Sequence, residues 1–313
     1  MGRKAGQPGR AVTAAVKRGN LSMTILENKR FDEERALYGS RDLVLRNSAF
    51  DGPADGESAL KESRGITLEN VFCNLRYPFW HDHALTLRNC ELTALCRAAL
   101  WYSEGVRITN TKLHGIKALR ECSDVTVEDC DIDSPEFGWS TRGIAMRRTT
   151  ASSEYFMLRA ERLRFSDVHL TGKYSFQYIT DGVFENCVFD TKDAFWHAKN
   201  VTVKNSVLKG EYLAWYAEGL TLEHCKIIGT QPFCYCRGLK LVDCEMVDTD
   251  LCFERSEVEA TITTPVVSIK NPYAGRICVP AVGEVIRDDE NAVGEVVVCP
   301  DGGKEKPHAC ACA

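Results

Sequence analysis

Three segments of the chain decide its fold: LTLRNCEL at residues 85–92, VTVEDCDI at residues 125–132 and LTLEHCKI at residues 220–227. Each begins with an apolar residue, alternates apolar and polar residues, and then has Asn, Asp or His before a cysteine. Alternation with a period of two residues is typical of a β-strand. Because the same pattern recurs along the chain, the sequence predicts a repeat protein built from short strands.

The first apolar residue of each pattern, called the anchor, recurs at nearly constant spacing. Nine of the eleven steps between anchors are 19 residues, and the tryptophans keep this period, with steps of 21, 38, 57 and 19 residues. We therefore expect one structural unit for each anchor. The anchors are Leu43, Ile66, Leu85, Val106, Val125, Ile144, Leu163, Gly182, Val201, Leu220, Leu239 and Val258.

Three architectures use short β repeats, and they differ in what the unit must contain. A leucine-rich repeat needs a longer unit with a helical return segment, and a left-handed β-helix shows a six-residue sub-period. Neither is present, so we predict an all-β, single-stranded, right-handed parallel β-helix of about twelve 19-residue coils. With strands stacked at about 4.8 Å, twelve coils form a rod of roughly 55 Å.

The repeat also sets the expected domain limits. We expect a disordered basic N-terminal tail at residues 1–22, the parallel β-helix at 23–264, C-terminal capping strands at 265–300 and a flexible tail at 301–313. Met23 directly precedes the first patterned strand and is an alternative start to Met1. The capping strands contain three prolines, which deny backbone pairing to a further strand: Pro265, Pro272 and Pro280.

Composition excludes several classes of protein. The formal net charge is −5, which gives no global basic bias toward nucleic acid. No run of 18 apolar residues is present, so no membrane span is expected. The apolar stretch at residues 11–16 is broken and too short for a secretory signal, and we expect a cytoplasmic protein.

Cysteine usage supports the same expectation. Five of the fifteen cysteines stand five residues after an anchor, in a column that also accepts Ser, Thr and Val. Such a column selects small side chains, and buried free thiols are the reading we favour over disulfides between coils. The tail residues His308, Cys310 and Cys312 lack a partner motif, so no metal site is predicted there. The column cysteines are Cys90, Cys130, Cys187, Cys225 and Cys244.

Asparagine or aspartate occupies nine of eleven positions four residues after the anchor, as at Asn47 and Asn70. We expect a structural ladder of side-chain hydrogen bonds there. Six residues before the anchor, an apolar column suits the interior, as at Phe176 and Phe195. Five residues before it, tryptophan alternates with Lys, Arg and Gln, a mixture that does not suit a dry core. We expect this column to face outward: Trp80, Trp101, Trp139, Trp196 and Trp215.

Aromatic and charged residues flank the tryptophan column along the predicted rod. Aromatic rings bordered by charges suit a long polar polymer such as a polysaccharide, since sugar faces stack on rings and charged groups bind hydroxyls or uronate carboxylates. In the alternative, the indoles cap a corner of the coil and the charges pair with one another. The candidate ligand-binding residues beside the tryptophans are Tyr216, His197, Arg97, Glu121 and Glu154.

Catalysis is a separate question. Asp193 and Glu211 are expected on neighbouring coils, and two carboxyl groups at such a separation could serve a glycoside hydrolase. Arg120 could act in a polysaccharide lyase, as the base or as the group that neutralises a uronate. A ladder of structural ion pairs would give the same pattern. No cofactor is predicted, since the Ca²⁺ alternative, with Glu121 and Glu154 as ligands, has no dense acidic motif behind it.

Several longer strings make the chain resemble a known family. The resemblance covers about residues 24–290, and its strings are EERALYG, GESALKE, RYPFW, RAALWYSEG, GKYSF, KDAFWHAKNVTVKNS, GEYLAWYAEGLTLEHC, QPFCYC and SIKNP. They are similar to the bacterial family catalogued as domain of unknown function 3737. The resemblance implies a pectin-lyase-like, single-stranded right-handed β-helix, and it carries over no catalytic residues.

The sequence therefore predicts a β-helix protein that binds a polysaccharide or oligosaccharide along an aromatic and charged face. Cleavage of the bound glycan is a further hypothesis, with Asp193, Glu211 and Arg120 as its candidate catalytic residues. The alternative is a scaffold without catalytic activity that presents the same face to a protein partner or to a second copy. The sequence leaves the oligomeric state undetermined.

Overall fold

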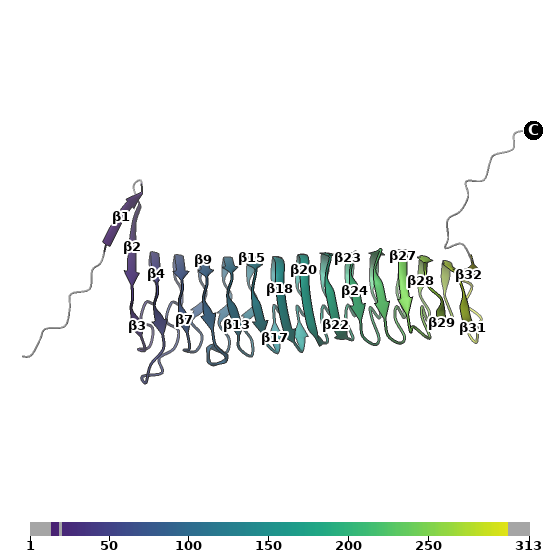
Figure 1. The fold of residues 1–313 in the computed structure, drawn as a ribbon, viewed down its shortest axis with the longest axis horizontal. Helices are drawn as coiled ribbons and strands as arrows, with labels where there is room; N and C mark the ends of the chain where they lie inside the picture. Colours follow the sequence, from purple (N-terminus) through teal and green to yellow (C-terminus); the bar gives the residue numbers. More distant parts are fainter. Residues whose placement is uncertain (1–13, 19–20, 300–313) are drawn as a thin grey trace, which may run out of the picture.

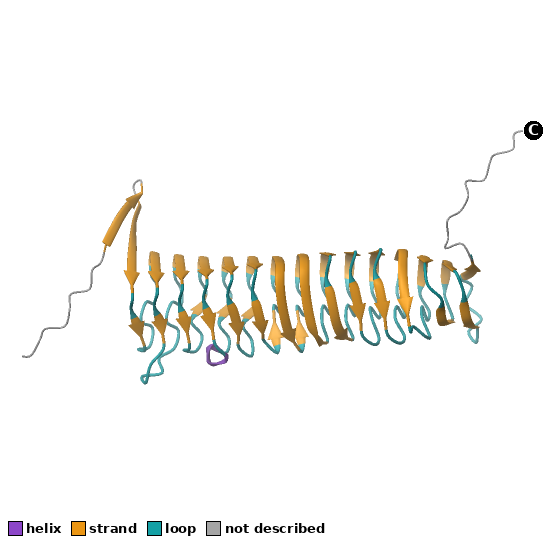
Figure 2. Cartoon of the chain, in the orientation of Figure 1, coloured by secondary structure: helices purple, strands orange, loops and turns teal. Residues whose placement is uncertain are grey.

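The computed structural model of the protein describes residues 14–18 and 21–299, and these residues form one elongated rod of stacked coils (Figure 1). The described residues form β-strands and connecting turns, with a single three-residue 3₁₀ turn, η1 (Ala94–Cys96) (Figure 2). The predicted all-β parallel solenoid is confirmed. It has about 14 turns and not twelve, because the repeat continues beyond both ends of the anchor series.

The anchors lie on one long stack of parallel strands. Within it each anchor pairs with the next, as in Val106 with Val125 and Val125 with Ile144. Thr24 precedes the first anchor in the same register, and Gly275 follows the last. The strands are β2 (Leu21–Glu27), β4 (Arg41–Arg46), β6 (Arg64–Glu69), β9 (His83–Arg88), β12 (Glu104–Thr109), β15 (Ser123–Glu128), β18 (Arg142–Ser153), β20 (Glu161–Lys173), β21 (Thr180–Glu185), β23 (Lys199–Lys204), β25 (Glu218–Glu223), β27 (Leu239–Val247), β28 (Glu257–Ile262), β30 (Ala274–Val279) and β32 (Glu295–Val298).

Two further stacks complete each coil. The long strands β18, β20 and β27 continue without a break into the second stack. Its other strands are β3 (Arg30–Phe31), β5 (Ala49–Phe50), β7 (Phe72–Cys73), β10 (Glu91–Leu92), β13 (Lys112–His114), β16 (Asp131–Asp133), β22 (Val188–Lys192), β24 (Val207–Lys209) and β26 (Lys226–Ile228). The third stack contains β8 (Phe79–Trp80), β11 (Leu100–Trp101), β14 (Leu119–Arg120), β17 (Glu136–Phe137) and β19 (Tyr155–Phe156).

The two ends of the rod are built differently. At the N-terminal end β1 (Ala14–Arg18) pairs antiparallel with β2, so part of the segment expected to be a disordered tail, residues 1–22, is a strand. At the C-terminal end the expected capping segment continues the coils: β30 and β32 extend the anchor stack, and β29 (Val266–Lys270) pairs in parallel with β31 (Val282–Ile286) in a separate sheet. Residues 1–13, 19–20 and 300–313, which include the rest of both predicted tails, lie outside the described residues.

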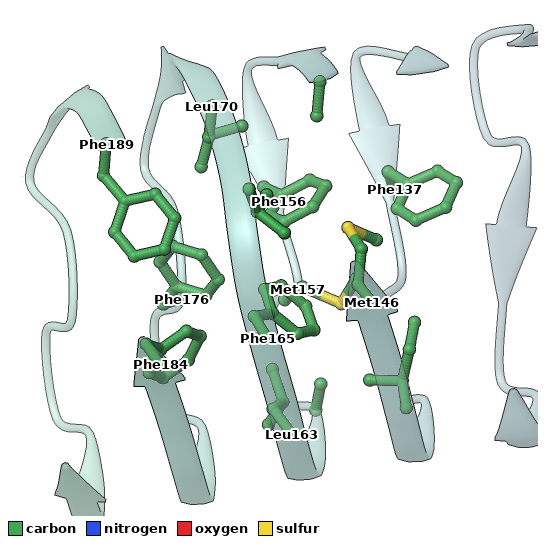
Figure 3. Close-up of a cluster of buried hydrophobic side chains, with 14 of the residues drawn as sticks. Phe137, Met146, Phe156, Met157, Leu163, Phe165, Leu170, Phe176, Phe184 and Phe189 are labelled. Atoms are coloured by element: carbon green, nitrogen blue, oxygen red, sulfur yellow. The ribbon is translucent and has the colours of Figure 1, made fainter. Parts of the chain in front are cut away.

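Aromatic and aliphatic side chains fill the interior of the rod. The apolar column six residues before the anchor is buried, as predicted, and its rings stack along the axis. Phe176 and Phe195 lie 4.8 Å apart between ring centroids with planes 15° from parallel. Phe184 and Phe189 pack against them from the other two walls (Figure 3). Each coil therefore buries side chains from all three of its sides against the coils above and below.

Two corners of each coil share one arrangement, in which a residue with positive φ is followed by a small side chain that accepts a backbone hydrogen bond. The residue four after the anchor has a positive φ, 56° at Asn70 and 52° at Asn89, a conformation that asparagine tolerates well. The predicted ladder forms, since Asn70 Nδ2 donates to Asn47 Oδ1 at 3.0 Å. The small buried residue that follows accepts a backbone N–H from the preceding coil, as Thr111 Oγ1 does from Cys90 at 3.2 Å. The second corner, three residues before the anchor, repeats this arrangement with serine, as at Ser103.

The cysteines confirm the prediction of free, buried thiols. Thirteen cysteines lie among the described residues, and eleven of them are buried free thiols. Burial raises the pKa of Cys96 to about 12 and that of Cys122 to about 11. These thiols are therefore protonated at neutral pH and act as small packing groups.

One buried carboxyl takes the place of serine at the second corner, and no sequence pattern predicted it. Asp82 occupies the position held by Ser63 and Ser103 on the neighbouring coils, and none of its surface is exposed. Its Oδ1 accepts the backbone N–H of Ser63 at 2.8 Å, whereas its Oδ2 has no partner among the described residues. Burial raises its pKa to about 8, so the carboxyl is mostly protonated at neutral pH.

Candidate functional site

The five tryptophans are half-buried at the edge of the third stack, and each is fixed by its indole nitrogen. Every Nε1–H donates to a backbone carbonyl of the next coil, for example Trp196 to Tyr212 at 2.6 Å and Trp215 to Gln231 at 2.8 Å. Gln177 in the same column makes the equivalent bond from its amide to Asp193 O at 3.1 Å. The indoles therefore hold successive coils together, which is the corner role considered as the alternative from sequence.

The tryptophan ring faces are covered by their neighbours in the column. Trp196 and Trp215 stack at 5.4 Å between centroids with planes 4° apart, and Trp80 and Trp101 stack at 5.1 Å. The Arg120 guanidinium lies between two indoles, 5.2 Å from the Trp101 centroid and 5.1 Å from that of Trp139. The column thus presents ring edges to solvent, and stacking of a sugar on an isolated indole face is not the geometry it offers.

A second, more exposed set of rings lies one residue further along the chain. Tyr178, His197, Tyr216 and Tyr235 come from four consecutive coils, and we call them the aromatic ladder. Their centroids are separated by 4.8, 4.9 and 4.8 Å, with planes 6 to 10° from parallel. Tyr178 is 48% exposed and Tyr216 42% exposed. A shorter ladder of the same kind, His81 and Tyr102 at 4.9 Å, lies nearer the N-terminus.

Backbone conformation explains why these rings project. All four ladder residues have positive φ, from 54° at His197 to 61° at Tyr216 and Tyr235. This conformation turns the chain through a corner between the third stack and the next anchor strand. Because every coil makes the same corner, the side chains repeat at the spacing of the strands.

The edges of the ladder carry unused polar groups. Among the described residues, no side chain or backbone group bonds to the hydroxyl of Tyr178, Tyr216 or Tyr235. Arg159 covers the outer face of Tyr178, with its guanidinium 5.9 Å from the ring centroid. Burial and the nearby Glu254 raise the pKa of Tyr235, so its phenol stays protonated. The ladder is therefore an exposed row of hydrogen-bonding groups on a rigid base.

The predicted carboxyl pair lies on neighbouring coils, since the backbone N–H of Asp193 donates to Glu211 O at 3.0 Å. The side chains have different environments. Glu211 is exposed and forms an ion pair with Lys192 at 2.7 Å. Asp193 is buried, and burial raises its pKa while the charges of Lys192 and Lys173 lower it. The cluster therefore contains the ion-pair ladder that the sequence analysis considered as the alternative to a catalytic pair.

The other predicted residues are distributed along the same side of the rod. Glu121 pairs with the guanidinium of Arg120 at 3.3 Å, beside the gap between Trp101 and Trp139. Glu154 is exposed next to Lys173, whose pKa it helps to raise. Arg97 is exposed in the turn that ends η1. The structure thus brings Trp196, His197, Trp215 and Tyr216 together.

Three residues that were not predicted as site residues complete the aromatic ladder. Tyr178 and Tyr235 extend the ladder, and Arg159 closes one end of it. Their shared position, four residues before the anchor, was the signal that could have identified them. No group of three or more potential metal ligands occurs within residues 14–18 and 21–299. Over the same ranges, no helix is long and apolar enough to cross a membrane.

The fold and its exposed face define a class, a parallel β-solenoid with an aromatic ladder along one corner. The chain belongs to the family described as protein of unknown function (DUF3737), whose model matches residues 24–297. This confirms the resemblance identified from the sequence. No curated protein matches the sequence.

Several solved structures are similar to this chain at low sequence identity. PfbA, a surface adhesin of Streptococcus pneumoniae, is 11% identical over 77% of this chain and 73% of its own, with a TM-score of 0.36. An alginate lyase from Paenibacillus sp. is 9% identical over 74% and 97%, with a TM-score of 0.37. The A-module of the Azotobacter vinelandii mannuronan C-5 epimerase AlgE4 is 7% identical over 87% and 85%, with a TM-score of 0.30. The likeness concerns the fold alone.

Proposed function

We propose that this protein binds an oligosaccharide or polysaccharide along the aromatic ladder. The observation that carries the proposal is the unbroken stack of four rings from consecutive coils, whose tyrosine hydroxyls have no hydrogen-bond partner among the described residues. A linear polymer lying along the rod would meet an aromatic ring at each of these four coils. Tyrosine is suited to this role because its ring is rigid and its hydroxyl both donates and accepts hydrogen bonds.

The mode of binding follows from which part of each ring is exposed. Because the faces stack on one another, a ligand contacts ring edges and phenol oxygens and does not lie flat on a ring. The first contacts are therefore hydrogen bonds from sugar hydroxyls to Tyr178, Tyr216 and Tyr235. Arg159 at one end of the ladder and Glu254, which lies near Tyr235 and pairs with Lys270, at the other supply charged groups at its border.

The surroundings of the candidate catalytic residues favour binding of the glycan without its cleavage. Glu211 is held by Lys192, and Arg120 is fixed between two indoles with Glu121 as its partner. A general acid or base needs a side chain that reaches the reacting bond. Asp193 is buried beside this ion pair and has little access to a polymer lying on the surface.

Tryptophan emission tests the proposal without a label. Trp215 lies 5.8 Å from Tyr235 and stacks on Trp196, so a ligand on the ladder changes its environment. We expect a saturable change with at least one member of a panel of neutral and acidic oligosaccharides. Tyr216→Phe, which keeps the ring and removes the hydroxyl, should weaken the binding by about twofold to tenfold, the worth of one neutral hydrogen bond.

Tyr273→Phe is the matched control. Tyr273 is 44% exposed but lies outside the ladder, where Arg237 covers its ring. Its substitution should leave the titration unchanged. Sedimentation velocity over a wide concentration range tests the scaffold alternative. No emission change with any sugar, together with self-association abolished by Tyr216→Ala, would replace glycan binding with a protein interface.

A further inference from the structure

A second face of the rod carries a shallow hollow with a different chemistry. It lies on the anchor stack, over strands β9 to β23. Over these strands the residue before the anchor is skipped in the strand pairing, as Gly105 is between Glu104 and Val106, and it has a positive φ, 68° at Gly105 and 70° at Gly143. Several of these skipped residues are small, so the sheet surface is recessed along this line.

Two arginines mark the ends of one section of the hollow. Arg107 pairs with Thr126, Thr126 with Ala145, and Ala145 with Arg164, so the four form one column on four consecutive coils. Three strand spacings of about 4.8 Å separate the arginine backbones by roughly 14 Å. The floor between them has only the small side chains of Thr126 and Ala145. Arg162 lies beside Arg164, next to the recess at Gly143.

These three arginines lack acidic partners, unlike other cations on the same sheet. Arg88 pairs with Glu69 at 3.4 Å and Arg147 with Glu128 at 3.3 Å. No ion pair or side-chain hydrogen bond joins Arg107, Arg162 or Arg164 to any described residue. A solvated guanidinium is ordinary on a protein surface, but three of them around one small-residue floor leave this section of the hollow with an excess of positive charge.

Two carboxylates also line the hollow, and they disfavour a ligand with closely spaced negative charges. A Cβ placed at Gly143 would lie 3.1 Å from Asp124 Oδ1 and 3.4 Å from Arg162 Nη2, although these groups form no ion pair. Asp181 accepts a hydrogen bond from Asn200 at 3.2 Å. A ligand with a negative charge on every unit would place some of its charges against these carboxylates. The lining also has no aromatic ring on which a nucleic acid base could stack.

From this arrangement we infer that the hollow between Arg107 and Arg164 binds a linear oligosaccharide that carries widely spaced uronate carboxylates. Guanidinium groups bind carboxylates in a two-bond geometry, and the carboxylate of Asp124 accepts a sugar hydroxyl. The small floor leaves space for the sugar ring between the two arginines. This site is on a different face from the aromatic ladder, so the inference stands whether or not the ladder binds a glycan.

Fluorescence anisotropy of a labelled oligosaccharide in which a uronate alternates with a neutral sugar tests the inference on the full chain. We expect saturable binding that weakens with added salt, and no binding of the methyl-esterified oligosaccharide, in which the charges are removed. Arg107→Gln and Arg164→Gln should each weaken the binding about tenfold. Arg88→Gln and Arg147→Gln, which change paired cations on the same sheet, should have effects below about twofold.

A second variant tests the site without removing any arginine. Thr126→Glu places a carboxylate on the floor between Arg107 and Arg164, and it should abolish the binding while the melting temperature stays near that of the parent. Equal binding of the methyl ester, or equal losses in the Arg88 and Arg147 variants, would overturn the inference. Preferential binding of single-stranded DNA over this oligosaccharide would overturn the assignment of the ligand.

Discussion

Asp82 shows how one residue sets a pH dependence for the whole fold. Its unfolded-state pKa is near 3.8 and its folded pKa is about 8, so the folded state binds the proton more tightly. The stability from this proton is fully present below the unfolded pKa and is lost as the pH rises through the folded pKa. We expect the free energy of unfolding to fall by up to about 1.4 kcal/mol per pH unit in this window, from this residue alone.

Asp82→Ser provides the comparison, since serine occupies this corner at Ser63 and Ser103. The variant should lose this pH dependence and be more stable than the parent at about pH 8, with a smaller difference at about pH 5. Denaturant unfolding at the two pH values measures the effect. Stability curves for the two proteins that run parallel over this range would contradict the assignment.

Gly182 is an anchor position where the interior forbids the usual aliphatic residue. A Cβ at this glycine would lie 2.7 Å from Cε2 of Phe184, which fills the space. Gly182→Val should therefore destabilise the protein by about 1–3 kcal/mol, although valine is the anchor at Val201. The double variant Gly182→Val with Phe184→Val should recover most of this loss, because Val203 occupies the equivalent position on the next coil. Additive losses in thermal unfolding would refute the packing argument.

At the scale of the coil, residue columns were the most predictable feature. The buried column at Phe176 and Phe195 and the ladder at Asn47 and Asn70 follow from period and residue type alone. The number of coils does not follow from the period and residue type, because the end coils lack the full pattern. Gly275, for example, stands where an aliphatic anchor is expected.

The candidate site was predictable only in part. The sequence predicted that Trp196, His197, Trp215 and Tyr216 lie on one face of the rod, because residues at the same distance from their anchors lie on the same side of successive coils. It did not indicate that the rings stack face to face, because that depends on the positive φ of the ladder residues. The partner of each indole N–H is a backbone carbonyl 16 to 18 residues later, which a side-chain pattern does not show.

The C-terminal strands should protect the rod from edge pairing. Strands β30 and β32 continue the anchor stack beyond β28, and β29 and β31 form a separate parallel pair. Their buried residues include Val266, Ile269, Ile277 and Val279. Deleting residues 265–299 exposes this interior and the free edge of β28, so we expect aggregation. Truncation after Cys299 keeps every described strand and is the control. A deletion variant that stays monomeric and unfolds cooperatively in light scattering and thermal melts would disprove the capping role.

At the scale of the whole molecule, about 14 coils present the same chemical positions along a single axis. At about 4.8 Å per coil this gives a rod of roughly 70 Å. Long ligands suit such a surface because each coil adds a contact of the same kind. The aromatic ladder and the arginine hollow occupy different faces of the rod, so they are separable by substitution.

The most direct test of glycan binding on the ladder is the NMR signal of the His197 imidazole during an oligosaccharide titration. His197 lies between Tyr178 and Tyr216, at 4.8 and 4.9 Å from their centroids, so a ligand on the ladder changes its shielding. We predict a saturable shift of His197 while His114, which pairs with Asp131 on the second stack, stays constant. An unchanged His197 signal at ligand concentrations that saturate the tryptophan emission would place the bound sugar elsewhere and contradict the account.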